Sequence, residues 1–197
     1  MKIPSRINVK FIPTLLHEFE FEDVDRLLEL NKDLKNIIKD KDKRPYQNAI
    51  LRGSIVLIVA RIENFIEDLF EWTSAKIFFN LFDDELNHFY KISSRKFNNP
   101  ISDNINKLFL GIGIYNVLDR IYDDPKKNKQ LVTRLNELVN RRHDIAHGKI
   151  GGMLRANKKY AATTKQVVYW QIFAKKFMYL LEKTVSEILQ EEKNILL

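Results

Sequence analysis

The chain contains no cysteine among its 197 residues, so disulfides and thiolate metal sites are excluded. It also lacks any apolar run approaching the roughly 18 residues that a membrane-spanning helix needs. The N-terminal residues show no continuous apolar region followed by a small-residue cleavage site, as a secretion signal would. We therefore expect a cytoplasmic protein with no membrane-spanning segment.

Strand patterns are missing as well. No segment alternates apolar and polar residues between hairpin turns, whereas apolar residues recur with helical spacing along nearly the whole chain. The expected fold class is therefore all-α. The length and the 45% hydrophobic content predict a single domain spanning residues 1–197, with a substantial core.

The expected helices follow from this periodicity and from capping residues. Residues 46–80 are the most apolar and should form the central core helix. Ser102 or Asp103 is the expected N-cap of a helix kinked near Gly111 and Gly113, while Pro125 fits the first turn of the next helix. The full set of expected helices is 14–40, 46–80, 83–92, 102–122, 125–148 and 163–188, the last capped by Thr163 or Thr164.

Positive charge is concentrated in one region of the chain. Residues 126–165 contain eleven lysines and arginines against two acids, a net charge of +9, whereas the remaining residues sum to −2. Such a region suits a polyanionic partner, although a solvated charged surface is an equally good explanation of charge alone.

One nine-residue segment, Asn140 to Gly148 (NRRHDIAHG), is the only place where the sequence suggests chemistry. This motif segment contains two of the four histidines of the chain, and it places Arg142 five residues before His147. Arginine is a planar cation matched to phosphate, and histidine, with an unperturbed pKa of about 6.5, exchanges protons near neutrality. The pair is therefore suited to phosphodiester cleavage without a metal ion.

Helical spacing separates the two residues. Arg142 continues the apolar face of its helix, which comprises Leu131, Leu135, Leu138 and Ile145. It therefore needs a partner, an interface or a cleft, because an unpaired buried charge is costly. A polar stripe lies on the adjoining face and consists of Asn140, His143, Asp144 and His147. Since Arg142 and His147 are about 140° apart on an ideal helix, a single helix presents the pair poorly.

The motif segment resembles the defining motif of the HEPN superfamily of all-helical ribonucleases, in which an arginine and a polar residue are followed by a histidine. A second stretch, LRGSIVLIVARIENFIEDLF (residues 51–70), is similar to a helix of HEPN-like nucleases from bacterial toxin and defence loci, although Gly53 interrupts the shared pattern. The resemblance covers about residues 45–195 and places the motif at the C-terminal end of a late helix. Residues 1–44, an expected N-terminal helix, lie outside it.

The resemblance implies a metal-independent endoribonuclease that cleaves single-stranded or loop RNA, acts as a toxin or antiphage defence effector, and needs no cofactor. It also implies a homodimer, and an antitoxin or another defence-system protein is a candidate partner. Arg142 and His147 are the implied catalytic pair, assisted by Asn140, His143 and Asp144. The implied substrate-binding residues are Arg141, Lys149, Arg155, Lys158 and Lys159.

Several other interpretations stay open. The whole domain could bind RNA or a partner protein without catalysis. Arg142 could form a structural ion pair with Glu63 or Glu67, and Glu63 could instead orient the motif. His147 could serve only as a cation at a helix C-terminus. His143 and His147, one turn apart, could bind a metal ion with Asp144, although no further ligand is evident.

Overall fold

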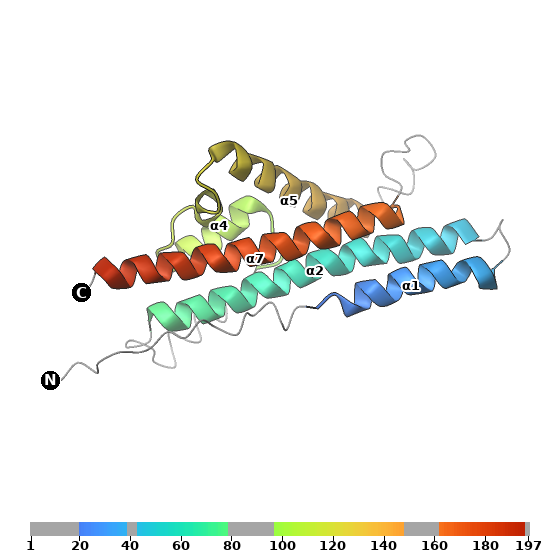
Figure 1. Ribbon diagram of the computed structural model, residues 1–197, viewed down its shortest axis with the longest axis horizontal. Helices are drawn as coiled ribbons and strands as arrows, with labels where there is room; N and C mark the ends of the chain where they lie inside the picture. Colours follow the sequence, from blue (N-terminus) through green and yellow to red (C-terminus); the bar gives the residue numbers. More distant parts are fainter. Residues whose placement is uncertain (1–19, 39–42, 79–96, 148–161, 196–197) are drawn as a thin grey trace.

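The computed structural model of the chain describes residues 20–38, 43–78, 97–147 and 162–195, and every regular element within them is helical. The prediction of an all-α fold is confirmed. Two long helices run side by side, α1 lies along one of them, and α4 and α5 pack on the other side of the pair (Figure 1). The elements are α1 (Glu22–Ile37), α2 (Lys43–Ile77), α4 (Ser102–Leu110), the 3-10 helix η2 (Val117–Arg120), α5 (Pro125–Ala146) and α7 (Thr164–Ile195).

Helix α2 is the central element, as its apolar sequence predicts. It packs against α1, α7 and α5, and its middle turns are fully buried at Ile55, Ile58, Ile62, Phe65 and Ile66. A helix that is apolar around most of its circumference is stable only when other elements cover it on several sides. The position of α2 therefore follows directly from its composition.

Helix α1 is fixed to α2 and α7 by polar contacts as well as by its buried Phe21 and Val24. Arg61 of α2 donates to Asp23 at 2.9 Å, and the Nε2 atom of Gln171 in α7 donates to Asp25 at 2.8 Å. The N-terminal helix is therefore an integral part of the bundle.

The start of α5 is fixed in three ways. Pro125 occupies the first turn, and the Asp124 side chain caps the helix by accepting from the backbone N–H of Lys126 at 2.8 Å. The buried Asn128 amide accepts from the backbone N–H of Tyr122 and donates to the carbonyls of Asp119 and Tyr122. Because this end is fixed, the other end of the helix presents the motif segment at a defined position.

One helix end and one helix cap differ from expectation. The helix expected over 102–122 ends at Leu110, because Gly113 (φ +88°) and Asn116 (φ +48°) adopt left-handed conformations that reverse the chain before η2. Neither Ser102 nor Asp103 caps α4; the Asn136 side chain of α5 accepts from the Ser102 backbone N–H at 2.9 Å instead.

The other expected elements are either observed or lie outside the described residues. Thr163 caps α7 in a reciprocal pair with Gln166, as the sequence predicts. Gly53 lies inside α2 without interrupting it. The helix expected over 83–92 and the first part of that expected over 14–40 lie outside the described residues. None of the helices in the described ranges combines the length and hydropathy that a membrane-spanning segment requires.

Candidate active site

The motif segment lies at the C-terminal end of α5, as predicted. The helix runs to Ala146, and His147 is its C-cap residue, with φ −90° and ψ 8°. The backbone N–H of His147 still donates to the carbonyl of His143 at 3.0 Å, so the last turn is closed in the usual way. The chain leaves helical geometry directly at the candidate catalytic histidine, whose side chain is exposed.

Arg142 lies on the face of α5 that packs against α2. The side chains of Leu131, Leu135, Leu138 and Val139 are buried along this face, and Arg142 continues it with 31% of its side chain exposed. Its Nη2 atom lies 3.9 Å from Oε2 of Glu63, whose side chain is 14% exposed. An ion pair of this arginine with an acid of α2, one of the alternatives to a catalytic role, is therefore observed, at a distance too long for a direct hydrogen bond.

Burial is the largest influence on the pKa of the Glu63 carboxyl. Desolvation raises the pKa of its carboxyl above the ordinary value, and the positive charge of Arg142 opposes that shift without cancelling it. Arg142 keeps nearly a third of its side chain exposed while its Nη2 atom lies beside Glu63.

Glu67, one turn further along α2 and the other acid named as a partner for Arg142, has a raised pKa that the sequence did not predict. Burial and the charges of Glu63, Asp68 and Glu71 raise its pKa to about 7. The spacing of Glu63, Glu67 and Glu71 at intervals of four residues on a largely buried helix was the available signal. A carboxyl that titrates near neutrality one turn from the partner of Arg142 makes the electrostatics of this region dependent on pH.

The two histidines of the motif segment lie next to each other. Their ring centroids are 4.2 Å apart with an angle of 50° between the ring planes, as residues one turn apart on a helix can be. Both side chains are exposed and neither is on the α2-facing side with Arg142. Arg142 therefore lies within α5, whereas His147 is the C-cap residue directly after its last helical residue.

The remaining candidate residues divide into two groups. Asn140 is exposed on α5, whereas Arg141 and Asp144 are half-buried. Four predicted substrate-binding residues lie outside the described residues: Lys149, Arg155, Lys158 and Lys159. The structure therefore brings together Asn140, Arg142, His143, Asp144 and His147 at one helix end, with Glu63 beside Arg142.

Metal binding by the two histidines requires additional ligands. Within the part of the chain that the structure describes, no group of three or more histidines and acids is arranged to hold a metal ion. The mechanism that the resemblance implies assigns the chemistry to arginine and histidine side chains.

Comparison with known proteins identifies a family for this chain. Residues 22–187 match the protein family described as RiboL-PSP-HEPN. The match includes α1, which the motif-based resemblance left out, and it includes the whole motif segment. Neither the curated proteins nor the solved structures contain a significant match.

Proposed function

The chain belongs to the RiboL-PSP-HEPN family, and on this premise we propose that it is a metal-independent endoribonuclease acting on single-stranded or loop RNA. A HEPN domain indicates a role related to RNA or nucleotides, and HEPN proteins include ribonucleases. The observation that supports this proposal lies at the C-terminal end of α5. There Arg142 is partly exposed and His147, the C-cap residue, is exposed.

The proposed reaction uses the 2′-hydroxyl of the substrate as nucleophile. Its oxygen attacks the adjacent phosphorus in line, the bond from phosphorus to the 5′-oxygen breaks, and the products carry a 2′,3′-cyclic phosphate and a 5′-hydroxyl. His147 takes the proton from the 2′-hydroxyl or gives one to the departing oxygen. Arg142 stabilises the charge that develops on the phosphate oxygens. Asn140, His143 and Asp144 orient the histidine or contact the substrate.

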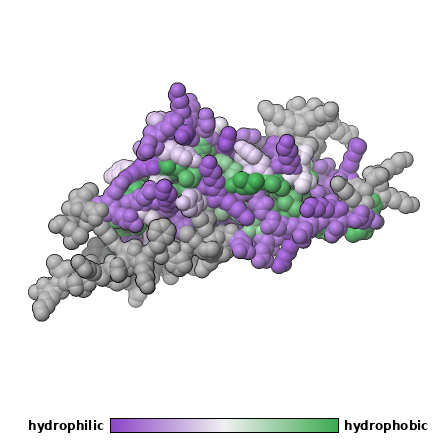
Figure 2. Space-filling model, viewed as in Figure 1, coloured by the Kyte–Doolittle hydropathy of each residue, from purple (hydrophilic) through white to green (hydrophobic). Residues whose placement is uncertain are grey.

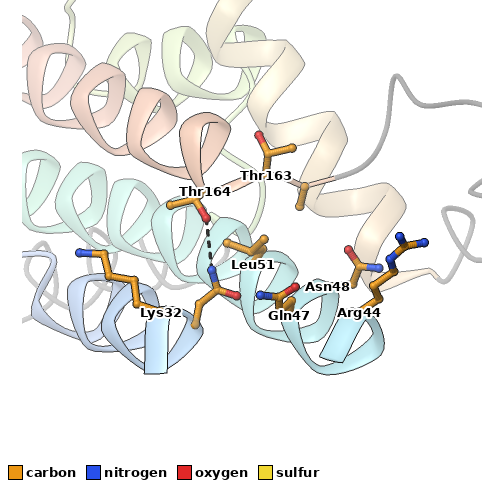
Figure 3. Close-up of a pocket in the computed structure, with 9 residues that line it drawn as sticks. Lys32, Arg44, Gln47, Asn48, Leu51, Thr163 and Thr164 are labelled. Atoms are coloured by element: carbon orange, nitrogen blue, oxygen red, sulfur yellow. Dashed lines mark hydrogen bonds between the residues drawn. The ribbon is translucent and has the colours of Figure 1, made fainter. Parts of the chain in front are cut away.

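A homodimer is part of this proposal. Arg142 and His147 point in different directions on one helix, so a second copy related by a two-fold axis is needed to bring an arginine and a histidine to one phosphate. The start of α7, which lies near the end of α5 (Figures 1 and 3), carries exposed apolar residues at Val168, Tyr169 and Ile172. The face in Figure 2 shows hydrophobic surface flanked by hydrophilic side chains. We assign the exposed side chains of Val168, Tyr169 and Ile172 to the contact with the second copy.

The decisive experiment is incubation of the full chain with labelled single-stranded RNA and with DNA of the same sequence, each with and without EDTA. We expect RNA to be cleaved to a 2′,3′-cyclic phosphate product in both conditions, and DNA to survive because it lacks the nucleophile. Cleavage that EDTA abolishes contradicts the metal-independent mechanism. If the protein acts as a toxin or defence effector, expression of the active protein should arrest growth of the host. Expression of the His147→Ala variant should not.

A second candidate is a HEPN module that binds RNA or a partner protein without catalysis. The ion pair between Arg142 and Glu63 favours it, because it gives the arginine a structural role within one protomer. RNA binding that weakens with salt, without cleavage by any assembled form, supports this candidate over the ribonuclease.

A further inference from the structure

Helix α2 carries three acids at intervals of one helical turn, Glu63, Glu67 and Glu71, which we call the acid row. All three side chains are only partly exposed, and the motif helix α5 packs against α2 (Figure 1). Side chains four residues apart on a helix are neighbours, with about 5–6 Å between their Cβ atoms, and like charges at this spacing repel each other. The ionisation of each acid in the row therefore depends on that of the next.

Arg142 of α5 lies beside the first acid of the row, 3.9 Å from Glu63. Its positive charge favours the ionised form of Glu63 and so opposes the effect of burial on the pKa of this carboxyl. At Glu67, burial and the charges of Glu63, Asp68 and Glu71 all raise the pKa, which reaches about 7. The proton that this part of the row retains near neutrality is therefore placed on Glu67, and the charge is placed on Glu63 beside the arginine.

Few other charged groups share this partly buried environment. Among the described residues of the four helices packed against α2, every charged side chain of α1 and α4 is exposed. The charged side chains that are not fully exposed are Arg141, Arg142 and Asp144 on α5 and Glu182 on α7. None of these four is among the charges that shift the pKa of Glu67. The acid row thus sets the charge of Glu67, and Glu63 connects it to Arg142.

We infer that Glu67 is a positioning residue, which acts on Arg142 through Glu63. When Glu67 carries a proton, Glu63 holds the guanidinium at a distance that leaves its donors available to a substrate phosphate. Loss of this proton adds a negative charge one turn away, which attracts the guanidinium more strongly and repels an incoming phosphate. The phosphate in this inference rests on the proposed function, whereas the coupling between Glu67 and Arg142 does not.

NMR titration of the full chain, following glutamate carboxyl and arginine guanidinium resonances, tests the coupling without RNA. We expect the Arg142 resonance to shift with the same midpoint as the Glu67 carboxyl. This step should vanish in Glu67→Gln and persist in Glu29→Gln, the matched control at an exposed position of α1. An Arg142 resonance that does not respond to Glu67 overturns the inference.

The same titration tests the role of Glu63 as the connecting residue. Glu63→Gln removes a like charge one turn from Glu67, so the midpoint of Glu67 should fall by about half a pH unit or more. The response of the Arg142 resonance to Glu67 should also become smaller. An unchanged midpoint in Glu63→Gln contradicts the coupling through Glu63.

Binding of a 2′-O-methyl RNA, which has no free nucleophile, tests the functional consequence. Between pH 6 and pH 8 the affinity of the parent should fall about fivefold further than that of Glu67→Gln. Because both proteins keep His143 and His147, the difference between their pH profiles reports Glu67 alone. Identical profiles for two proteins that bind the RNA overturn the inference. Absence of binding at every pH contradicts the proposed function instead, and the NMR titration then decides the inference by itself.

Discussion

The guanidinium of Arg142 lies 3.9 Å from the carboxylate of Glu63, which links the motif helix to the central helix of the bundle. Both side chains are partly shielded, so the attraction is screened less than in an exposed pair. The separation leaves the arginine without a direct hydrogen bond to this acid. Glu63 therefore restricts where Arg142 can lie while leaving its donors available to a phosphate.

Arg142→Ala and His147→Ala should each lower RNA cleavage by at least about a hundredfold, the usual scale for acid–base and charge-stabilising groups. Arg142→Lys should be nearly as damaging, because an ammonium cannot reproduce a bidentate phosphate contact.

His143→Ala should have a smaller effect, since the resemblance assigns the essential proton transfer to His147. Initial rates on a labelled RNA, with circular dichroism as the check on folding, measure these effects. Full activity of His147→Ala contradicts the role assigned to this histidine.

Glu63→Gln should lower kcat by about tenfold with little change in KM, because it removes the charge that positions Arg142 without removing a group that contacts RNA. The adjacent Asn64, exposed on the same helix, provides the control, and Asn64→Ala should leave kcat unchanged. Glu63→Asp should restore part of the loss. A rise in kcat for Glu63→Gln shows that Glu63 restrains the arginine rather than positioning it.

Periodicity and helix-terminal residues predicted much of this arrangement. The apolar face of α5 extended to Arg142 in the sequence, so a partner on a neighbouring helix could be expected, and Glu63 was one of two named acids. Pro125 and Gly148 likewise predicted the two ends of the motif helix to within about two residues. These features depend on local spacing, which sequence shows directly.

Features that depend on tertiary contacts were not predictable. The cap of α4 comes from Asn136, 34 residues away, and no local signal points to it. The sequence predicted a kink at Gly111 and Gly113, whereas the helix ends and positive φ angles at Gly113 and Asn116 turn the chain. The pocket in Figure 3 is lined by residues from 31–32, 44–51 and 162–164, which become neighbours only in the folded bundle.

Glu67 should make stability fall as pH rises. Its pKa is raised from 4.5 to about 7 in the folded protein, so the folded state binds more protons than the unfolded state between these values. Unfolding then releases a proton, and the free energy of unfolding decreases with rising pH through this window.

Glu67→Gln removes this penalty. Above pH 7 we expect the variant to be more stable than the parent by about 1 kcal/mol, after allowing for solvent screening of a half-exposed carboxyl. For a chain of this length that corresponds to a Tm higher by about 2–4 °C. Glu29→Gln, at an exposed position on α1, is the control and should leave the pH profile of Tm unchanged. Parallel pH profiles for the parent and Glu67→Gln contradict the prediction.

The composite site predicts complementation between inactive proteins. Because ideal helical spacing would place Arg142 and His147 about 140° apart, we expect an active site in the dimer to draw its arginine from one protomer and its histidine from the other. Each homodimer of Arg142→Ala or of His147→Ala then lacks one member of the pair in both sites. A mixed dimer contains one site with both residues intact, so mixing the two inactive proteins should restore up to about half of the parental rate per mixed dimer. A charge introduced into the proposed α7 contact by Ile172→Glu should abolish both dimerisation and the restored cleavage. Full activity of a protein that sedimentation shows to be monomeric contradicts the composite site, because a single α5 then suffices.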